Sequence, residues 1–433
     1  MRLLFKCFLL TCVLNLLAIM KRNYYIVALI MLTFFVISFI TNIFGPLTPE
    51  MKKGFDLNLK LVALLYFAFF IAYGVMSIPA GMLIEKYNEK KMMIVAFIVA
   101  FAGSLLFALY PDYFIALPSL FIIGFGFAIL QVVINPLLRT AGGEEHYAFN
   151  SVLAQLIFGG ASFLSPLVYE YMMDELKKPG KTPLSFFHTI IPSNLPWISL
   201  YWLFAAICLL MIIVIIFSKF PKVELKEEEK AGAIATHVML FKKPVVLLYF
   251  LGIICYVGTE QGTANNISQF LSIYHGFDPD KTGANAVAYF WGLMTAGGVL
   301  GLLLLKILDS RKVLIIFTTL ALICLSFALF GPAKISLFAF PAVGFFASVM
   351  YPIIFSLALN SINEHHGSFS GILCTGIIGG AVVPLVIGWL GDSVGLRNGM
   401  IFLYLTMGYI LLIGFWARPL IKNKTIFNKR EMV

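Results

Sequence analysis

Charged residues are scarce in this chain of 433 residues. They make up 12% of it and hydrophobic residues 61%, whereas ordinary soluble domains are about 25% charged. A soluble fold of this length could not cover so much apolar surface, because chain size limits the fraction of surface that folding buries. The composition therefore excludes a soluble globular protein and indicates one whose outer surface is covered by membrane lipid.

The residues of a catalytic or metal site are also missing. The six cysteines lie within apolar stretches and lack the spacing of a metal site or redox pair, so we interpret them as core residues. No nucleophile elbow, metallohydrolase motif or phosphate-binding loop occurs. The net charge of +10 comes from residues in short loops, not from a basic patch interleaved with aromatic rings. We therefore expect no enzyme, no cofactor, no metal and no nucleic-acid partner.

What the chain has in abundance is long apolar runs. A helix needs about 20 mainly apolar residues to cross the hydrocarbon core of a bilayer. The strands of a transmembrane barrel would instead alternate polar and apolar residues. We predict twelve membrane-spanning helices, at 24–46, 61–84, 92–110, 115–138, 148–172, 196–218, 244–268, 284–305, 312–330, 335–359, 368–390 and 398–418.

One longer polar stretch divides these spans six and six. We predict a six-helix bundle at 20–218, a solvated linker at 219–243, a second bundle at 244–418 and a tail at 419–433. Residues 1–19 begin with basic residues and an apolar run, like a signal peptide, but no small-residue cleavage site follows. We interpret them as an N-terminal extension, caused by a misassigned start codon or forming an amphipathic or frayed segment.

The distribution of Lys and Arg predicts the orientation. If both termini and the even-numbered loops face the cytoplasm, they hold 22 of the 31 basic residues. The odd-numbered loops hold the other nine, which are Lys52, Lys53, Lys60, Lys177, Lys178, Lys181, Lys281, Lys334 and Arg397. Because cytoplasmic loops carry the excess of basic residues, we predict a multi-pass protein of the cytoplasmic (inner) membrane with both termini inside.

Two sets of residues recur at one spacing of 220 positions. They are Gly81, Lys86 and Lys91 with Gly301, Lys306 and Arg311, and Gly159-Gly160-Ala161 with Gly379-Gly380-Ala381. A spacing of half the chain favours two homologous halves, and parallel halves with a site between them are a transporter architecture. The predicted fold is an all-α membrane protein with twelve transmembrane helices in two homologous six-helix bundles.

The segment between the second and third spans carries a family resemblance. Gly81-Met-Leu-Ile-Glu85-Lys86-Tyr-Asn88-Glu-Lys90-Lys91 resembles the loop signature of the major facilitator superfamily. There a glycine permits close helix packing, and an acid and bases tie helix ends together. This implies structural or gating roles for Gly81, Glu85, Lys86, Lys90 and Lys91. Asn88 replaces the usual turn glycine, and Asn tolerates left-handed conformations. The alternative is an ordinary basic cytoplasmic loop.

Four further stretches resemble one branch of that superfamily, the fucose permeases and glucose/galactose transporters, which are sugar:proton symporters. They are Gln131-Val-Val-Ile-Asn135-Pro136, Cys255-Tyr256-Val257-Gly258-Thr-Glu260, the stretch 344–357 with Tyr351-Pro352, and the stretch 377–392 with Gly379-Gly380. The resemblance covers the chain from Met20 onward and implies sugar transport by alternating access.

Two acids of such symporters are missing. Their proton-carrying aspartate in the first span and glutamate in the fourth fall at Gly45 and Gln131, which cannot titrate. A sugar-contacting asparagine in the fifth span is replaced by Phe158, whereas Gln155 is kept. The resemblance therefore implies the frame of a transporter without its proton relay, and the coupling ion stays open between H⁺, Na⁺ and none.

Glu260 is the clearest acid inside a predicted span. A buried carboxylate in a membrane is costly and usually functional, and threonines, asparagines and glutamines surround this one in sequence. We interpret Glu260 as the coupling residue of a cavity-lining segment broken at Gly258 or Gly262. The alternative is a seventh span that ends early, with this stretch as a wet external mouth.

Amides and aromatic rings complete the predicted site. Gln131 and Asn135 lie four positions apart and share one helix face, and Pro136 permits a bend there that Asn135 could simply brace. Amides supply the donors and acceptors that sugar hydroxyls need, and a tyrosine ring either stacks on the sugar or only packs. The predicted substrate-binding residues are Gln131, Asn135, Gln155, Tyr256, Gln261 and Tyr351, and Pro136 and Pro352 are predicted structural residues.

We predict a secondary transporter of a neutral hexose-like sugar that works as a monomer in membrane lipid. One alternative is transport of another small solute, such as an amino sugar derivative, an organic acid or a drug; another is an uncoupled uniporter. A sensor with this fold would carry a soluble signalling domain, and a polytopic enzyme would carry a cluster of His, Asp or Cys. The sequence shows neither feature.

Overall fold

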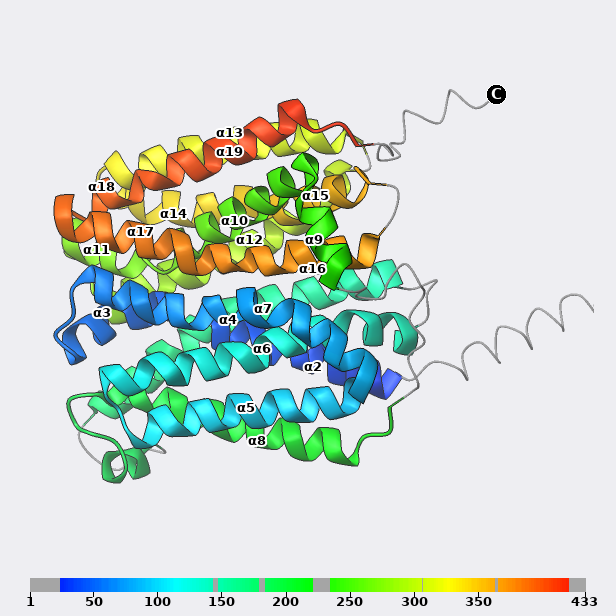
Figure 1. Ribbon diagram of the computed structural model, residues 1–433. Coiled ribbons are helices and arrows are strands. Elements are labelled where there is room, and N and C mark those ends of the chain that lie inside the picture. The colour runs from blue at the N-terminus through cyan, green and yellow to red at the C-terminus, as the bar shows by residue number, and fades with distance from the viewer. Residues whose placement is uncertain are drawn as a thin grey trace, which may run out of the picture.

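The computed structural model describes residues 24–142, 147–178, 184–220, 234–305, 307–362 and 365–419 (Figure 1). These residues are almost entirely helical and contain no strand. The predicted N-terminal extension at 1–19 and all but the first residue of the tail lie outside the described residues.

The long helices follow the predicted spans. The first half contains α2 (Tyr24–Thr41), α3 (Phe44–Gly54), α4 (Leu59–Tyr87), α5 (Glu89–Leu109), α6 (Tyr113–Gly142), α7 (Tyr147–Lys177) and α8 (Ser199–Phe217). The second half contains α10 (Pro244–Ala264), α11 (Ile267–His275), α12 (Ala284–Leu305), α13 (Ser310–Phe330), α14 (Ala333–Ala347), α15 (Met350–Leu359), α16 (His366–Thr375), α17 (Gly379–Val394), α18 (Leu396–Met400) and α19 (Phe402–Trp416). Short helical turns occur at η2 (Ser185–Thr189), η3 (Pro196–Ile198), η5 (Pro279–Gly283) and η6 (Gly376–Ile378).

Eleven stretches of the described residues are long and apolar enough to cross a membrane. The remaining predicted span, the fifth at 148–172, corresponds to α7, a helix of 31 residues that is less apolar than its neighbours and is not among the eleven. The buried apolar residues form two clusters, one mainly from α2–α8 and the other mainly from α10–α19. Figure 1 shows the corresponding two bundles side by side, and they meet where α4 packs along α17 and α7 along α12.

Several spans are interrupted. The first breaks at Asn42, between α2 and α3, and the tenth at Ser348, between α14 and α15. In both, a proline stands four positions later, Pro46 or Pro352. A proline has no N–H for the carbonyl four residues earlier, and its ring clashes with that carbonyl. The positions of these two prolines in the sequence therefore explain where the two spans break.

The seventh span breaks at Asn265-Asn266, where α10 ends and α11 follows. The predicted break at Gly258 or Gly262 is wrong, because both glycines lie inside the continuous α10. They permit close packing instead: a Cβ on Gly258 would lie 2.2 Å from a methyl group of Val383, and one on Gly262 would lie 2.9 Å from Ile387. Both glycines let α10 approach α17.

Part of the predicted linker is helical. Residues 234–241 form α9 (Ile234–Phe241), in which Leu240 is fully buried, and α9 packs against α10 and α16. The prediction of a solvated linker is therefore wrong for one face of this segment, where His237 and Leu240 are buried, whereas Val238 and Met239 are exposed. Residues 221–233 of the linker lie outside the described residues.

Candidate functional site

The two bundles are joined by polar contacts at the end away from the linker, here called the distal end. Figure 1 shows this end on the left, opposite the side where α2 begins and α19 ends. The hydroxyl of Thr48, on α3, donates to the backbone carbonyl of Asn265 at 2.8 Å. The carboxylate of Asp392, at the end of α17, accepts from the backbone N–H groups of Leu59 and Lys60, which begin α4. Both contacts cross from one bundle to the other.

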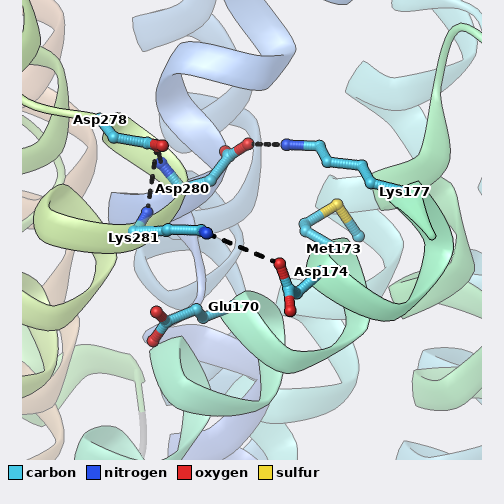
Figure 2. A pocket seen from close by; sticks show the side chains of 7 residues that line it. All are labelled: Glu170, Met173, Asp174, Lys177, Asp278, Asp280 and Lys281. Atoms are coloured by element: carbon cyan, nitrogen blue, oxygen red, sulfur yellow. Dashed lines mark hydrogen bonds and ion pairs between the residues drawn. The ribbon is translucent and has the colours of Figure 1, made fainter.

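A charged pocket of about 230 Å³ also lies at the distal end, between α7 and η5 (Figure 2). Asp280, on η5, accepts a hydrogen bond from the hydroxyl of Tyr169 at 2.7 Å and forms an ion pair with Lys177. Lys281 lies 3.8 Å from Asp174. Sequence reasoning did not select these residues. Their charge suits a neutral solute poorly, and their contacts join α7 of the first bundle to the second.

The interior contains a second polar cluster, centred on Glu260. Glu260 is half-buried on α10, one turn after Tyr256, whose hydroxyl is a hydrogen-bond partner of its carboxylate. The ring of Tyr256 lies 5.7 Å from that of Tyr351, on α15. The amide nitrogen of Gln261 lies 3.1 Å from a carboxylate oxygen of Glu260. Four predicted site residues, from two helices of the second bundle, are therefore close together.

The stretch around Glu260 is not a wet external mouth. Thr259, Gln261, Thr263, Asn265 and Asn266 are all buried, and α10 continues to Ala264. The alternative of an early end to the seventh span is therefore wrong. Packing against α17 and α19 explains why this polar stretch stays helical and dry, since the hydroxyl of Thr259 pairs with that of Thr406 at 2.6 Å.

Asn42, on the first bundle, reaches this cluster. Its Oδ1 atom lies 3.4 Å from the amide nitrogen of Gln261, and its Nδ2 atom donates to Ser162 at 2.8 Å. Sequence reasoning missed Asn42, although it is an amide within the first predicted span and stands four positions before Pro46. The cluster thus joins the two bundles in the interior of the molecule.

Comparison with known proteins identifies the family. Residues 30–377 match the model of the Major Facilitator Superfamily. The chain belongs to this superfamily.

Within the superfamily the similarity extends over most of the chain. It is 31% identical over 409 residues to a glucose/galactose transporter of Brucella abortus, covering 91% of this chain and 94% of the relative. It is 27% identical over 403 residues to the L-fucose-proton symporter of Escherichia coli, covering 87% and 89%. The fold matches the crystal structure of the superfamily transporter FucP in the outward conformation, with a TM-score of 0.67 and 22% identity over 90% of this chain and 98% of that one. The resemblance found in the sequence is confirmed.

The other predicted substrate-binding residues of this superfamily member lie on α6 and α7. Gln131 is half-buried on α6, and the side chains of Asn135 and Pro136 lie outside the described residues. Gln155 is exposed on α7, one turn before Gly159, where a Cβ would lie 1.9 Å from the hydroxyl of Thr295 on α12. Gln155 therefore lies near the seam between α7 and α12, and its contact with substrate stays a prediction.

The facilitator loop between α4 and α5 lies near the linker end. Lys90 donates to the backbone carbonyls of Ile216 and Ser218 at 2.8 Å, so it ties the start of α5 to the end of α8. Asn88 has a positive φ of 69°, as expected for a residue in place of a turn glycine, and its side chain caps α5 by accepting from the N–H of Lys91.

The remaining predicted gating residues differ in how much of them is described. Gly81 is half-buried on α4, Lys91 is exposed on α5, and Pro352 is exposed at the start of α15. The side chains of Glu85 and Lys86 lie outside the described residues. The gating roles of all these residues stay predictions.

Proposed function

We propose that this protein moves a neutral hexose-like sugar across the cytoplasmic membrane by alternating access, coupled to a cation at Glu260. The observation that carries the proposal is the cluster of Tyr256, Glu260 and Tyr351, which α10 and α15 bring together beside the contact between the two bundles. The relatives support the choice of substrate, because they are named as glucose/galactose and fucose transporters.

The chemistry of the cluster suits a sugar. Tyrosine rings offer an apolar face to the hydroxyl-poor side of a hexose, and their hydroxyls, the carboxylate and the amide of Gln261 match its donors and acceptors. Tyr351 is half-buried, so part of its side chain is accessible, whereas Tyr256, whose ring centre lies 5.7 Å from that of Tyr351, is 4% exposed. A site of paired hydrogen-bonding groups rejects analogues that leave those groups unpaired.

The orientation follows from the basic residues, with the linker end in the cytoplasm. The distal end then faces the outside, and the contacts of Asp280, Asp392 and Thr48 close it in this structure. Transport requires these contacts to break and re-form as the bundles rock. The helix breaks at Asn42 and Ser348 offer places where such a movement can be absorbed.

Uptake into proteoliposomes tests the proposal. The purified protein should accumulate labelled glucose, galactose or fucose when a pH or Na⁺ gradient is imposed, and a panel of organic acids and amino sugars should compete poorly. Tyr351→Ala should raise the KM for the sugar, whereas Tyr110→Ala, at an exposed tyrosine that caps the end of α5 in the first bundle, should not. Transport of an organic acid or a drug without sugar uptake would overturn the proposed substrate.

A further inference from the structure

A groove lies on the outer surface of the second bundle, between α13 and α14. Its volume is about 400 Å³, and residues of these two helices line it. Each helix contributes an exposed ring, Phe327 with 54% and Phe338 with 74% of its surface exposed. The smaller lining residues Cys324, Ala339 and Ala342 are more buried. The two rings therefore form the sides of the groove, and the small residues form its floor.

The groove runs through one half of the membrane. Arg311, at the start of α13, donates to the carbonyl of Ala417 just after α19, so α13 begins at the linker end. The end of α13 and the start of α14 therefore lie at the distal end. From Lys334 to Ala342 the groove follows α14 for about 12 Å, at a rise of about 1.5 Å per residue. One leaflet, half of a hydrocarbon core of about 30 Å, is about 15 Å thick. With the predicted orientation, the groove lies in the outer leaflet.

A single positive charge stands at the distal end of the groove. It belongs to Lys334, which lines the groove and is exposed. Lys334 is the only charged residue between Lys312 and Glu364 in the sequence, and no carboxylate among the described residues forms an ion pair with it. A lysine near the end of a transmembrane helix lays its carbon chain along apolar surface and its ammonium group at the polar boundary of the membrane. Lys334 therefore offers its charge to a group outside the protein.

The first turn of α14 adds positive potential at the same place. The first N–H groups of a helix have no partner within the helix, and they form the positive end of its dipole. Pro332 stands at the N-cap position of α14 and has no side-chain oxygen that could accept from them. Lys334 lies within this first turn. The N–H groups and the ammonium group together favour an anion at this end of the groove.

We propose that an anionic glycerophospholipid of the outer leaflet binds here, with one acyl chain in the groove and its headgroup phosphate at Lys334 and the start of α14. The lipid tails of the surrounding membrane are as apolar as the groove. The shape of the groove therefore holds the chain in place, and the net charge of the headgroup selects the lipid. Both helices belong to the second bundle, so the site does not require contact between the bundles. This lipid site goes beyond sugar transport and does not depend on it.

Photochemical crosslinking of the full-length protein in nanodiscs tests the site. The discs consist of phosphatidylcholine with a small fraction of phosphatidylglycerol that carries a photoreactive group on one acyl chain. Labelling of peptides from α13 and α14 should saturate as this fraction rises. Phosphatidylcholine with the same reactive chain should label these peptides less and without saturation. Lys334→Gln should raise the half-saturating fraction of phosphatidylglycerol about fivefold, the expected effect of one lysine beside an anionic headgroup.

Lys60→Gln is the matched control, because Lys60 is also exposed at the start of a helix at the distal end but does not line the groove. Ala342→Leu fills part of the floor and should lower the labelling of both helices. Equal labelling by the two lipids, or an equal loss in Lys334→Gln and Lys60→Gln, would show only a general attraction to the membrane surface and overturn the site. If α13 and α14 stay unlabelled at every fraction, the groove has another occupant, such as a second copy of the chain, and the proposal is wrong.

Discussion

The carboxylate of Asp392, at the end of α17 in the second bundle, caps the N-terminus of α4 in the first. Its two oxygens accept hydrogen bonds from the N–H groups of Leu59 at 2.8 Å and Lys60 at 2.7 Å. The first N–H groups of a helix have no partner within the helix, and a negative charge there also meets the positive end of the helix dipole. The cap must break whenever the bundles separate at the distal end.

Asp392→Asn should therefore open the distal end more often. The asparagine keeps one acceptor but loses the charge, which should weaken the closed state by about 1 kcal/mol. Spin labels at Phe186, in the first bundle, and Ile273, in the second, would report the change, because both side chains are exposed near this end. The population at longer label separations should grow. Ser393→Ala, at the neighbouring exposed position, is the matched control, and the same growth in that variant would contradict the role of the cap.

The contacts of Asp280 predict a larger effect at the same end. Its side chain is 12% exposed and has two partners on α7, Tyr169 and Lys177. Asp280→Asn leaves Lys177 without its counter-charge, and we expect a loss of about 1–3 kcal/mol from the closed state. Lys281→Gln breaks only an exposed pair with Asp174, which should contribute less than about 1 kcal/mol. The population at longer spin-label distances should therefore grow more in Asp280→Asn than in Lys281→Gln. Equal distance distributions in the two variants would show that Asp280 does not help to hold the distal end closed.

Glu260→Gln separates coupling from movement of the sugar. The glutamine keeps the shape of the side chain and its contact with Gln261 but can neither carry a proton nor balance a cation. We expect gradient-driven accumulation of sugar to be lost while exchange of sugar across the membrane continues. Counterflow and uptake assays on the same proteoliposomes measure the two activities. Normal accumulation against a gradient would place the coupling residue elsewhere or make the protein a facilitator without coupling.

The membrane-spanning helices and the centre of the site could be predicted from the sequence, because both depend on local features. Apolar runs marked the spans, and Glu260 stood out as an acid within one of them. Asn42 and Asp392 escaped because their partners are remote in sequence: Asn42 meets Gln261 across 219 positions, and Asp392 meets Leu59 across 333. Hydrophobic periodicity cannot identify contacts between residues so far apart in sequence. These contacts depend on how the two bundles pack against each other.

The helix breaks show the same limit. Pro46 and Pro352 could have predicted the interruptions at Asn42 and Ser348, since proline acts on the carbonyl four residues earlier. The break at Asn265-Asn266 has no proline nearby, and the carbonyl of Asn265 instead accepts from Thr48 of the other bundle. The break of the seventh span was predicted at a glycine, Gly258 or Gly262. In the structure both glycines allow α10 to pack close to α17.

The backbone conformation of Asn88 leads to a prediction about the stability of the protein. Its backbone has φ 69° and ψ 161°, a region that glycine occupies freely and other residues at a cost of about 1–3 kcal/mol. Asn88→Gly relieves this strain, and replacing the cap to the N–H of Lys91 by glycine costs only a few tenths of a kcal/mol. The melting temperature should rise. Asn360→Gly, at a helix end with φ −74°, is the control, and it should not stabilise the protein. A lower melting temperature for Asn88→Gly would show that the cap outweighs the strain.

His275 predicts how the distal end responds to acid. It ends α11, and burial together with the nearby charge of Arg397 holds the pKa of His275 below its ordinary value of 6.5. Its Nε2 atom is buried without a hydrogen-bond partner. As the pH falls below 6.5, His275 becomes protonated in the unfolded chain but stays neutral in the folded protein. The free energy of unfolding therefore decreases until the pH has passed the lower pKa that His275 has in the folded protein.

His275→Gln removes this proton uptake and should lose less stability than the wild type when the pH drops from about 7 to about 5. The guanidinium of Arg397 lies 4.4 Å from the centre of the Tyr274 ring, a contact that does not titrate in this range and that both proteins keep. Melting temperatures measured at the two pH values, with Asn398→Ala as the control for a surface change, would test the difference. Equal acid sensitivity in His275→Gln and the wild type would assign the loss of stability to other groups.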